Sequence, residues 1–329
     1  MALNAEKLVS MARQDPNLVY GEALLNIAAT HDKVLALTAD TGHYVGAEEF
    51  AAQFPERFFD VGISEQNLIG MAAGLAASGY NVFASTFAVF ITERVFELLK
   101  LDVAYRHLNV KLIGLSSGLS TTTMGNSHYC CDDVAMTTLL PGFTVLAPGD
   151  KAELYEMVTQ LQDFAGPVYV RINVNQMLHT SPFTLTLGKA MCMTPETELG
   201  VQTDAVDVCL LSYGSMVSEA LRAAKAITRK GYKAAVYNFH TLKPLDEEAL
   251  RLILTSSKLV VTLEEHYVQG GLGSMVAQFK GLHDLPAKLL TYGIAQGFFS
   301  AGSYLHLLKE SRLGASFIVP EVLQVLAAL

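Results

Sequence analysis

The chain lacks the sequence features of nucleic-acid-binding and disulfide-rich proteins. Its 23 basic residues against 32 acidic ones give a net charge of -9, and no run of like charges occurs. The basic stripe that nucleic acid requires is therefore missing. The four cysteines form no Cys-X-X-Cys pair, which excludes a zinc motif or a disulfide framework and favours a reducing, cytoplasmic setting.

Long apolar runs are also missing. The longest, Val82–Ile91, is much shorter than the roughly 20 residues that span a bilayer. The N-terminus has no basic start followed by an apolar run, which a secretory signal would show. We therefore expect a soluble, cytoplasmic protein that contacts neither nucleic acid nor membranes.

What the chain does contain is a regular alternation of apolar runs and helical patterns over its 329 residues. The runs VLALTAD, RFFDVG, NVFASTF, NVKLIGLSS, TVLAPG and PVYVRINV are typical of buried strands. Further runs, VDVCLLSYG, KAAVYNF, KLVVTLEE and AKLLTYGI, follow later in the chain. Strands separated by helices predict an α/β fold with parallel sheets covered on both faces.

The alternation pauses between residues 175 and 204, where proline, threonine and glycine occur without helical periodicity. A domain boundary falls in such a segment. We predict a first domain at 1–180, a linker at 181–203 and a smaller α/β domain at 204–329. Ligands bind beyond the carboxyl ends of parallel strands, so the segments after each strand are the candidate sites.

The first such segment is FFDVGISEQNLIGMAAGLAASG, residues 58–79. A strand ends near Val61, Ser64 is a good helix cap, and Glu65 begins a helix rich in glycine and alanine, which allows close packing. An acid in the first turn of a helix often does no more than complement the helix dipole. On its own, this segment leaves both roles for Glu65 open.

The second segment is FASTFAVFITERVF, residues 83–96. Phe87, Phe90 and the charged pair Glu93 and Arg94 are three to four residues apart, hence on one face of a helix that follows a strand. Aromatic rings beside an acid could hold a flat, nitrogen-containing ring by stacking. Such a spacing is, however, usually that of a helix packed into the core.

The order of these motifs carries more information than either alone. A strand, then GISEQN, then a Gly/Ala helix and then STFAVF are followed by TVLAPGD, PVYVRI, YGSMVSEALRAA, TLKPLD and LEEHYVQGGLG. This series resembles the transketolase family of thiamine-diphosphate enzymes over nearly the whole chain. The resemblance implies a pyrimidine-binding domain followed by the smaller C-terminal domain of that family.

The resemblance also implies roles at the cofactor. Glu65 matches the family's glutamate that hydrogen-bonds a ring nitrogen of the aminopyrimidine and shares a proton with it. The ring then removes the proton from the thiazolium carbon, which attacks a ketose carbonyl. Phe90, with Phe87 behind it, matches the position that stacks on the pyrimidine. Asp40, at the end of the first strand, is similar to a family position near the cleft, although an acid there can equally serve a turn.

Three further residues are candidates for contact with the substrate. His128 lies where the family has a histidine near the sugar, and we expect it to take part in catalysis. Arg171 lies where an arginine holds the substrate phosphate, an anion that suits a guanidinium. His43 follows the first strand and could line the cleft, although a loop histidine is often only a surface group.

A complete transketolase has an N-terminal half in which a Gly-Asp-Gly motif and a later asparagine hold the metal and the diphosphate. That half is missing here. The chain offers only PGDK at 148–151, followed by an ordinary helix pattern at 152–164, and GGLG at 270–273, which predicts a turn before a helix. We therefore expect no metal ligands here. The chain is similar to the second subunit of a split transketolase, and an N-terminal partner should supply the Mg²⁺ and diphosphate site, in an assembly of two heterodimers.

The loop LSTTTMGNSHYCC departs from the family pattern. Ser116 stands where transketolases have a histidine, and Met124 stands where they have an acid that binds a sugar hydroxyl. A pocket without that acid discriminates less against changes at the hydroxyl. We expect a transfer of a two-carbon ketol unit from an unusual, branched or modified ketose to an aldose phosphate.

Three alternatives stay open. GISEQN is also close to the corresponding segment of 1-deoxyxylulose-5-phosphate synthase, and the β subunit of a 2-oxoacid dehydrogenase has both domains. Each of these decarboxylates a 2-oxoacid, so release of carbon dioxide would separate them from a transketolase. A paralogue that only stabilises its partner would have no physical need for an acid beside an aromatic pair.

Overall fold

The computed structural model describes residues 3–194 and 206–329, which form two compact units. The first unit comprises residues 1–117 and 136–185, and the second comprises 118–135 and 186–329. The segment 118–135 thus belongs to the second unit, although it lies in sequence between two parts of the first. The predicted linker, 181–203, lies partly outside the described residues and stays a prediction, as do the predicted domain boundaries.

The first unit is built on parallel strands in the order β5-β6-β4-β3-β1-β2. Its strands are β1 (Val34–Thr38), β2 (Phe58–Asp60), β3 (Asn81–Phe87), β4 (Val110–Leu115), β5 (Thr144–Leu146) and β6 (Val168–Arg171). Apart from β2, these strands are almost completely buried. Strands covered on both faces carry continuous apolar runs, which is why the sequence predicts them correctly.

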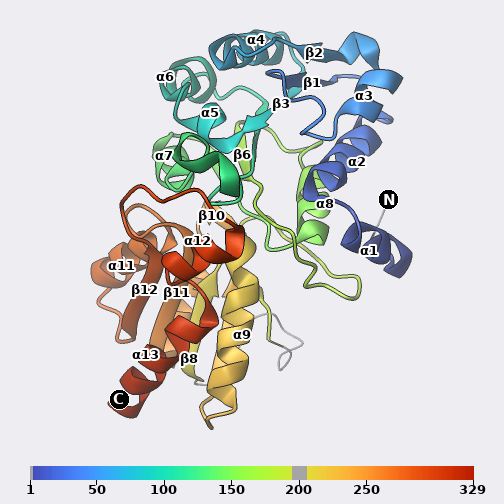
Figure 1. The fold of residues 1–329 in the computed structure, drawn as a ribbon. Helices are drawn as coiled ribbons and strands as arrows, with labels where there is room; N and C mark the ends of the chain where they lie inside the picture. The colour runs from blue at the N-terminus through green and yellow to red at the C-terminus, as the bar shows by residue number, and fades with distance from the viewer. Residues whose placement is uncertain (1–2, 195–205) are drawn as a thin grey trace. The chain divides into compact units, whose positions relative to one another are not determined.

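Helices cover both faces of this sheet, with α2, α3 and α8 on one face and α4, α5 and α6 on the other (Figure 1). The helical segments of the unit are α1 (Ala5–Ala12), α2 (Pro16–Ala28), α3 (Glu48–Gln53), η1 (Pro55–Arg57), α4 (Glu65–Ala77), α5 (Ala88–Thr92), α6 (Phe96–Leu98), η2 (Leu99–Ala104) and α8 (Lys151–Gln160). A further helix, α7 (Asp133–Leu139), spans the change from the second unit back to the first.

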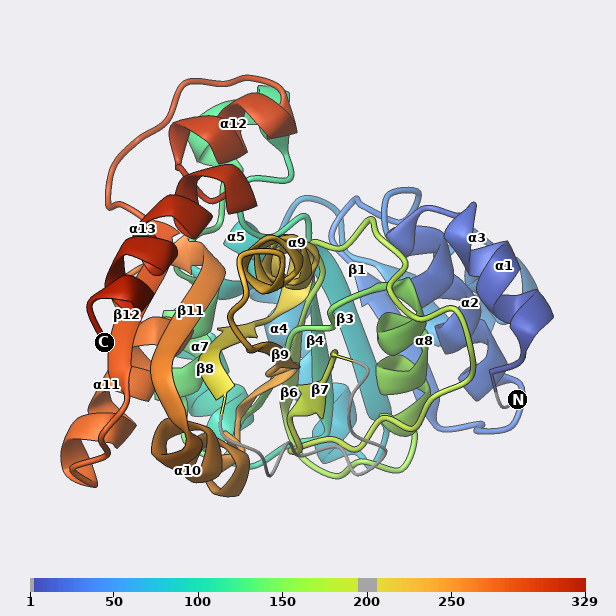
Figure 2. The ribbon, with the colours of Figure 1, turned by 90° about the horizontal axis from the view of Figure 1, so that it is seen from below.

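The second unit has a sheet in the order β12-β11-β8-β9-β7, parallel except for the last pair. Helices α9 and α13 lie on one side of it, and α10 and α11 lie on the other (Figure 2). The strands of this sheet are β7 (Met191–Cys192), β8 (Val206–Ser212), β9 (Ala234–Asn238), β11 (Ser257–Tyr267) and β12 (Lys288–Ile294), and the short strand β10 (Thr241–Lys243) of this unit lies outside the sheet. The helical segments are η3 (Thr122–Ser127), η4 (Gly214–Met216), α9 (Val217–Thr228), α10 (Glu247–Ser256), α11 (Leu272–Leu282), α12 (Tyr304–Glu310) and α13 (Ala315–Ala327).

The predicted α/β class with parallel sheets is confirmed. The sequence did not predict the short strands β7 and β10, because two or three residues are too few for a period of two to be recognised. Among the described residues, no helix is long and apolar enough to cross a membrane.

Candidate active site

Four of the predicted residues lie at the carboxyl ends of strands in the first unit. Asp40 lies two residues after β1, Glu65 follows β2, Phe87 is the last residue of β3, and Arg171 is the last residue of β6. Because these strands are parallel, their carboxyl ends lie at one edge of the sheet, where α/β proteins bind their ligands. The topology therefore gathers residues that are up to 131 positions apart in sequence.

Glu65 is held at this edge by a tight turn between β2 and α4. Gly62 has a φ of 71°, a conformation that favours glycine, and the Ser64 amide donates to the Gly62 carbonyl at 2.7 Å. Ser64 is the N-cap residue as predicted, but its hydroxyl donates to the Val61 carbonyl at 2.8 Å and does not cap the helix. Glu65 is the first residue of α4 and only 3 % exposed.

Asp60 joins the two loops that follow β1 and β2. Its Oδ1 accepts hydrogen bonds from the backbone amides of both Asp40 and Gly62, each at 2.9 Å. Asp40 itself has a φ of 57° and its side chain is exposed. The sequence predicts no role for Asp60, although an Asp side chain commonly accepts from the backbone amide two residues on, here that of Gly62.

An aromatic group lies beside Glu65. The rings of Phe87 and Phe90 meet edge to face, with centroids 6.2 Å apart and planes at 89°. The ring of Tyr44, from the loop after β1, lies 5.9 Å from Phe87. Phe87 and Phe90 are half-buried and Tyr44 is 54 % exposed, so these rings are not wholly enclosed in the core.

Arg94 contacts both the acid and the aromatic group. Its Nη1 donates to Glu65 Oε2 at 2.8 Å, and its Cζ lies 4.6 Å from the centroid of the Phe90 ring. The Arg94 side chain is 42 % exposed, while that of Glu65 is 3 % exposed. Helix α5 ends at Thr92, so the predicted helical face does not reach Arg94, and a turn places it over Phe90.

This arrangement can hold a flat, nitrogen-containing ring. A buried carboxylate accepts a proton or a hydrogen bond from a ring nitrogen, and the face of Phe90 offers a stacking surface. The guanidinium is itself planar, delocalised and rich in N–H groups. Its contacts show that the acid and the ring face can both touch one planar N–H donor.

The remaining predicted residues have different surroundings. His43 lies on the surface, 79 % exposed, and its Nδ1 is 2.9 Å from Glu48 Oε1. The Arg171 side chain is completely buried. His128 belongs to the second unit, where its Nδ1 lies 2.9 Å from the Ser127 hydroxyl. The structure thus brings Glu65, Phe87 and Phe90 together within one unit, and the substrate-binding roles of the other three stay predictions.

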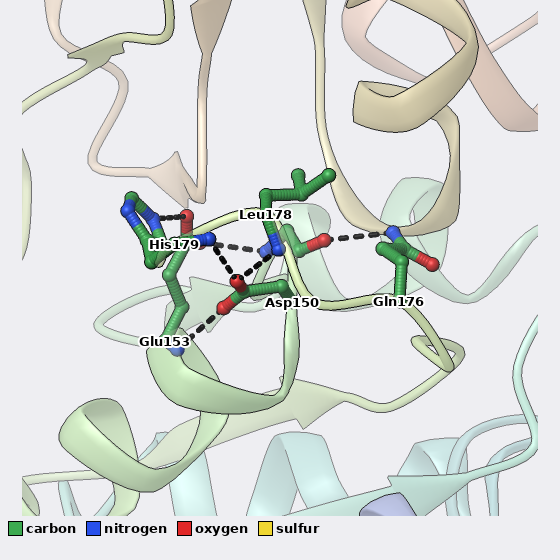
Figure 3. A network of polar contacts seen from close by, with 6 residues as sticks. Asp150, Glu153, Gln176, Leu178 and His179 are labelled. Carbon is green, nitrogen blue, oxygen red and sulfur yellow. Dashed lines mark hydrogen bonds and ion pairs between the residues drawn. The ribbon is translucent and has the colours of Figure 1, made fainter. Parts of the chain in front are cut away.

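A second cluster of buried acids lies at the start of α8 (Figure 3). Asp150 caps this helix: its Oδ1 accepts from the Glu153 amide at 2.8 Å, and its Oδ2 accepts from the amides of Leu178 and His179 at 2.7 and 2.9 Å. Glu153 Oε2 accepts from the Gly149 amide at 2.6 Å, and Oε1 lies 3.0 Å from His179 Nε2. Every carboxylate oxygen of Asp150 and Glu153 therefore has a partner.

The Asp150–Glu153–His179 cluster is close enough to hold a cation, but its chemistry favours a structural clamp. Burial raises the pKa of Asp150, and so does the nearby Glu153. Burial lowers the pKa of His179, but its hydrogen bond to Glu153 and the charges of Asp150 and Glu153 raise that pKa by more. An ion would displace bonds that already satisfy these groups. PGDK is thus the start of helix α8, with Asp150 as its N-cap residue.

The second unit also contains buried acids whose bonds lie within the unit. Glu264 accepts from the Tyr213 hydroxyl and from the amides of Leu272 and Gly273. GGLG therefore forms the turn and the first residues of helix α11, in agreement with the predicted turn before a helix. Its amides bind the internal carboxylate of Glu264. Glu265 accepts from the Leu119 amide at 2.7 Å and from the hydroxyls of Ser215 and Tyr304.

Comparison with protein families gives two matches that together cover most of the chain. Residues 14–177 match the transketolase pyrimidine-binding domain, and residues 198–318 match the transketolase C-terminal domain. A split-gene transketolase, solved as an inactive β4 tetramer, has the same fold with a TM-score of 0.83 and 34 % identity, over 95 % of this chain and 98 % of that one.

Two curated relatives are subunits of transketolases. The 6-deoxy-6-sulfo-D-fructose transketolase subunit of Clostridium sp. (strain MSTE9) is 36 % identical over 91 % of this chain and 91 % of its own length. An apulose-4-phosphate transketolase subunit of Phocaeicola vulgatus is 31 % identical over 82 % of this chain and 85 % of its own.

A longer relative corresponds to one of the alternatives. The 1-deoxy-D-xylulose-5-phosphate synthase of Halalkalibacterium halodurans is 32 % identical over 94 % of this chain, which spans 48 % of that protein. Relatives of the chain therefore include both transketolase subunits and a 1-deoxy-D-xylulose-5-phosphate synthase. The loop around Met124 and the chemistry of the reaction are the features that distinguish the two activities.

Proposed function

Because the chain belongs to the transketolase family, we propose that it is the second subunit of a split transketolase and holds the pyrimidine half of thiamine diphosphate. The observation that carries this proposal is the buried Glu65 carboxylate beside Phe90, both in contact with one planar N–H donor. An aminopyrimidine is also flat, and its ring nitrogen, once protonated, can donate to a carboxylate, so the residues fit that group.

Thiamine diphosphate supplies, when bound, the nucleophilic carbon that accepts a two-carbon ketol unit. In the proposed mechanism Glu65 binds the ring nitrogen and shares a proton with it at a carboxylate oxygen. Phe90, supported by Phe87, stacks on the ring and excludes water from the Glu65 side. The exposed Tyr44 and Asp40 lie on the neighbouring loop, at the edge of the same site.

The diphosphate and Mg²⁺ need oxygen ligands, and the acidic cluster at the start of α8 does not fit them. Asp150 and Glu153 are already bound by backbone amides and by His179 in the clamp at α8. We infer that an N-terminal partner contributes these ligands, in an assembly of two heterodimers. We place this assembly in the cytoplasm, since no disulfide joins the four cysteines. The subunit names of the relatives support a partner of this kind.

We infer that the donor is a modified or branched ketose, transferred to an aldose phosphate. The relatives named above act on a sulfonated fructose and on a phosphorylated apulose, and Met124 stands where the family's acid binds a hydroxyl. Met124 is 50 % exposed in η3. Without that acid, a donor altered at this hydroxyl leaves no carboxylate unpaired.

The test is a reaction mixture of this chain with its N-terminal partner, thiamine diphosphate and Mg²⁺. A panel of ketoses, ketose phosphates, sulfonated ketoses and pyruvate is offered with an aldose phosphate, and products are measured together with carbon dioxide. We expect ketol transfer without carbon dioxide release. Release of carbon dioxide from pyruvate would instead favour the synthase, and no turnover with any donor would favour a stabilising paralogue.

A further inference from the structure

Arg94 occupies the place at which the proposed cofactor ring would bind. Its guanidinium touches the two groups assigned to the aminopyrimidine, with Nη1 at 2.8 Å from Glu65 Oε2 and Cζ at 4.6 Å from the Phe90 centroid. A ring that stacks on this face of Phe90 and bonds to the same carboxylate needs the same volume. The guanidinium and the ring therefore exclude each other.

The contact of Arg94 differs in kind from that of Arg57. Arg57 also lies over a phenylalanine, with its Cζ 3.9 Å from the Phe54 ring, but its two terminal nitrogens donate to the backbone carbonyls of Ala28 and His31. Such bonds tie elements of the fold together. Among the described residues, Arg94 has one hydrogen-bond acceptor, the Glu65 side chain.

The Arg94 side chain is also able to move away from Glu65 and Phe90. Arg94 follows the last turn of α5, and its side chain is 42 % exposed, so rotation into solvent gives up only its bond to Glu65 and its contact with Phe90. While it stays, it pairs a carboxylate that would otherwise be buried without a partner, which is costly. The contact is therefore both stabilising for the free chain and readily exchanged for another planar donor.

We propose that Arg94 is a built-in occupant of the pyrimidine site, which keeps the unassembled chain closed to the cofactor until Arg94 swings out. This inference rests on the proposed function. A ligand that binds only the open state has its affinity reduced by the fraction of chains in that state. Removing the occupant therefore raises the affinity of the isolated chain for an aminopyrimidine.

The experiment titrates 4-amino-5-hydroxymethyl-2-methylpyrimidine into the full chain without a partner, with binding measured by ligand-observed NMR and by thermal shift. Arg94→Met keeps the length and removes the charge, and Arg94→Gln is a second variant that keeps polarity. Arg106→Met is the matched control, since Arg106 is exposed and shows no ion pair in the described structure. Circular dichroism checks the fold of each variant.

We expect both Arg94 variants to bind the probe at least about tenfold more tightly than the wild type, since the open fraction sets the apparent affinity. Arg106→Met should bind like the wild type, and the double variant Glu65→Gln/Arg94→Met should lose the gain. If folded Arg94 variants bind the probe no more tightly than the wild type, Arg94 is not an occupant, and the proposal is overturned.

A parallel titration separates this inference from the proposed function. Thiamine diphosphate and Mg²⁺ are added to the chain mixed with its N-terminal partner, with and without Glu65→Ala. If Glu65→Ala leaves cofactor binding intact, the proposed function fails. If Glu65→Ala abolishes binding while the Arg94 variants of the isolated chain gain nothing, only the occupant proposal fails.

Discussion

Two helix starts in the first unit carry buried acids with opposite kinds of partners. At the start of α4, Glu65 is paired with one half-exposed side chain, that of Arg94. At the start of α8, the oxygens of Asp150 and Glu153 are bound by four backbone amides, with Asp150 taking three of them, and by His179. The acids are buried in both places. Only the partner of Glu65 is a side chain that another donor could replace.

The difference separates a functional acid from a structural one. Backbone amides cannot leave a carboxylate unless the chain unfolds locally, whereas a surface arginine can turn into solvent. A buried acid is therefore a candidate for ligand binding when its partner is a detachable side chain. The same criterion assigns Glu264 of the second unit to structure, because two backbone amides and the buried Tyr213 hydroxyl hold it.

The largest expected difference is in turnover. Glu65→Gln should lower ketol transfer by the partnered enzyme by about 10²- to 10³-fold, since loss of a proton-transfer group costs about that much. The matched variant Glu153→Gln should leave the rate per folded molecule nearly unchanged and lower the thermal midpoint. Steady-state rates at saturating cofactor, with unfolding curves for both variants, measure this. An equal loss of rate in the two folded variants would contradict the distinction between a functional Glu65 and a structural Glu153.

The next effect is on stability. Asp150→Ala removes a helix cap and the acceptor for two loop amides, so the free energy of unfolding should fall by about 2–4 kcal/mol. Asp150→Asn keeps an oxygen acceptor and should cost less. Urea denaturation of the full chain measures both. A loss below about 1 kcal/mol for Asp150→Ala would mean that the clamp contributes no more than one ordinary hydrogen bond.

A smaller effect concerns the aromatic face. Phe90→Leu should weaken cofactor binding by the assembled enzyme about three- to tenfold, because an aromatic pairing contributes about 0.5–1.5 kcal/mol beyond its buried area. Phe54→Leu, a matched change beneath Arg57, should leave cofactor binding unaltered. Calorimetric titration distinguishes the two, and unchanged affinity in Phe90→Leu would remove the stacking role from this residue.

The smallest effect is a dependence of stability on pH. The net pKa of His179 is raised above its ordinary value of 6.5, because the hydrogen bond to Glu153 and the two acidic charges outweigh burial. Its contribution to stability is therefore fully present below pH 6.5 and is lost as the pH rises through the folded-state pKa. The thermal midpoint of the wild type minus that of His179→Gln should shrink between pH 6 and 9. Growth of that difference with pH would contradict the charged clamp.

The sequence predicts the strands, because apolar runs are local signals, whereas the shared site of Glu65 with Phe87 and Phe90 follows only from the resemblance to the transketolase family. The sequence predicts a helix that continues through Arg94, because the turn after Thr92 has no local signature, and so it gives Arg94 no role. The clamp was not predicted, because His179 approaches Asp150 from a segment without periodicity that lies 29 residues further along the chain. Contacts of that kind depend on tertiary packing.

The central claim is that this chain provides the pyrimidine half of a site that a partner completes. Calorimetric titration of thiamine diphosphate and Mg²⁺ tests it most directly, on the chain alone, on its mixture with the N-terminal partner, and on the mixture carrying Glu65→Ala. The account predicts binding only in the mixture and its loss with Glu65→Ala. Tight binding by the chain alone would contradict it.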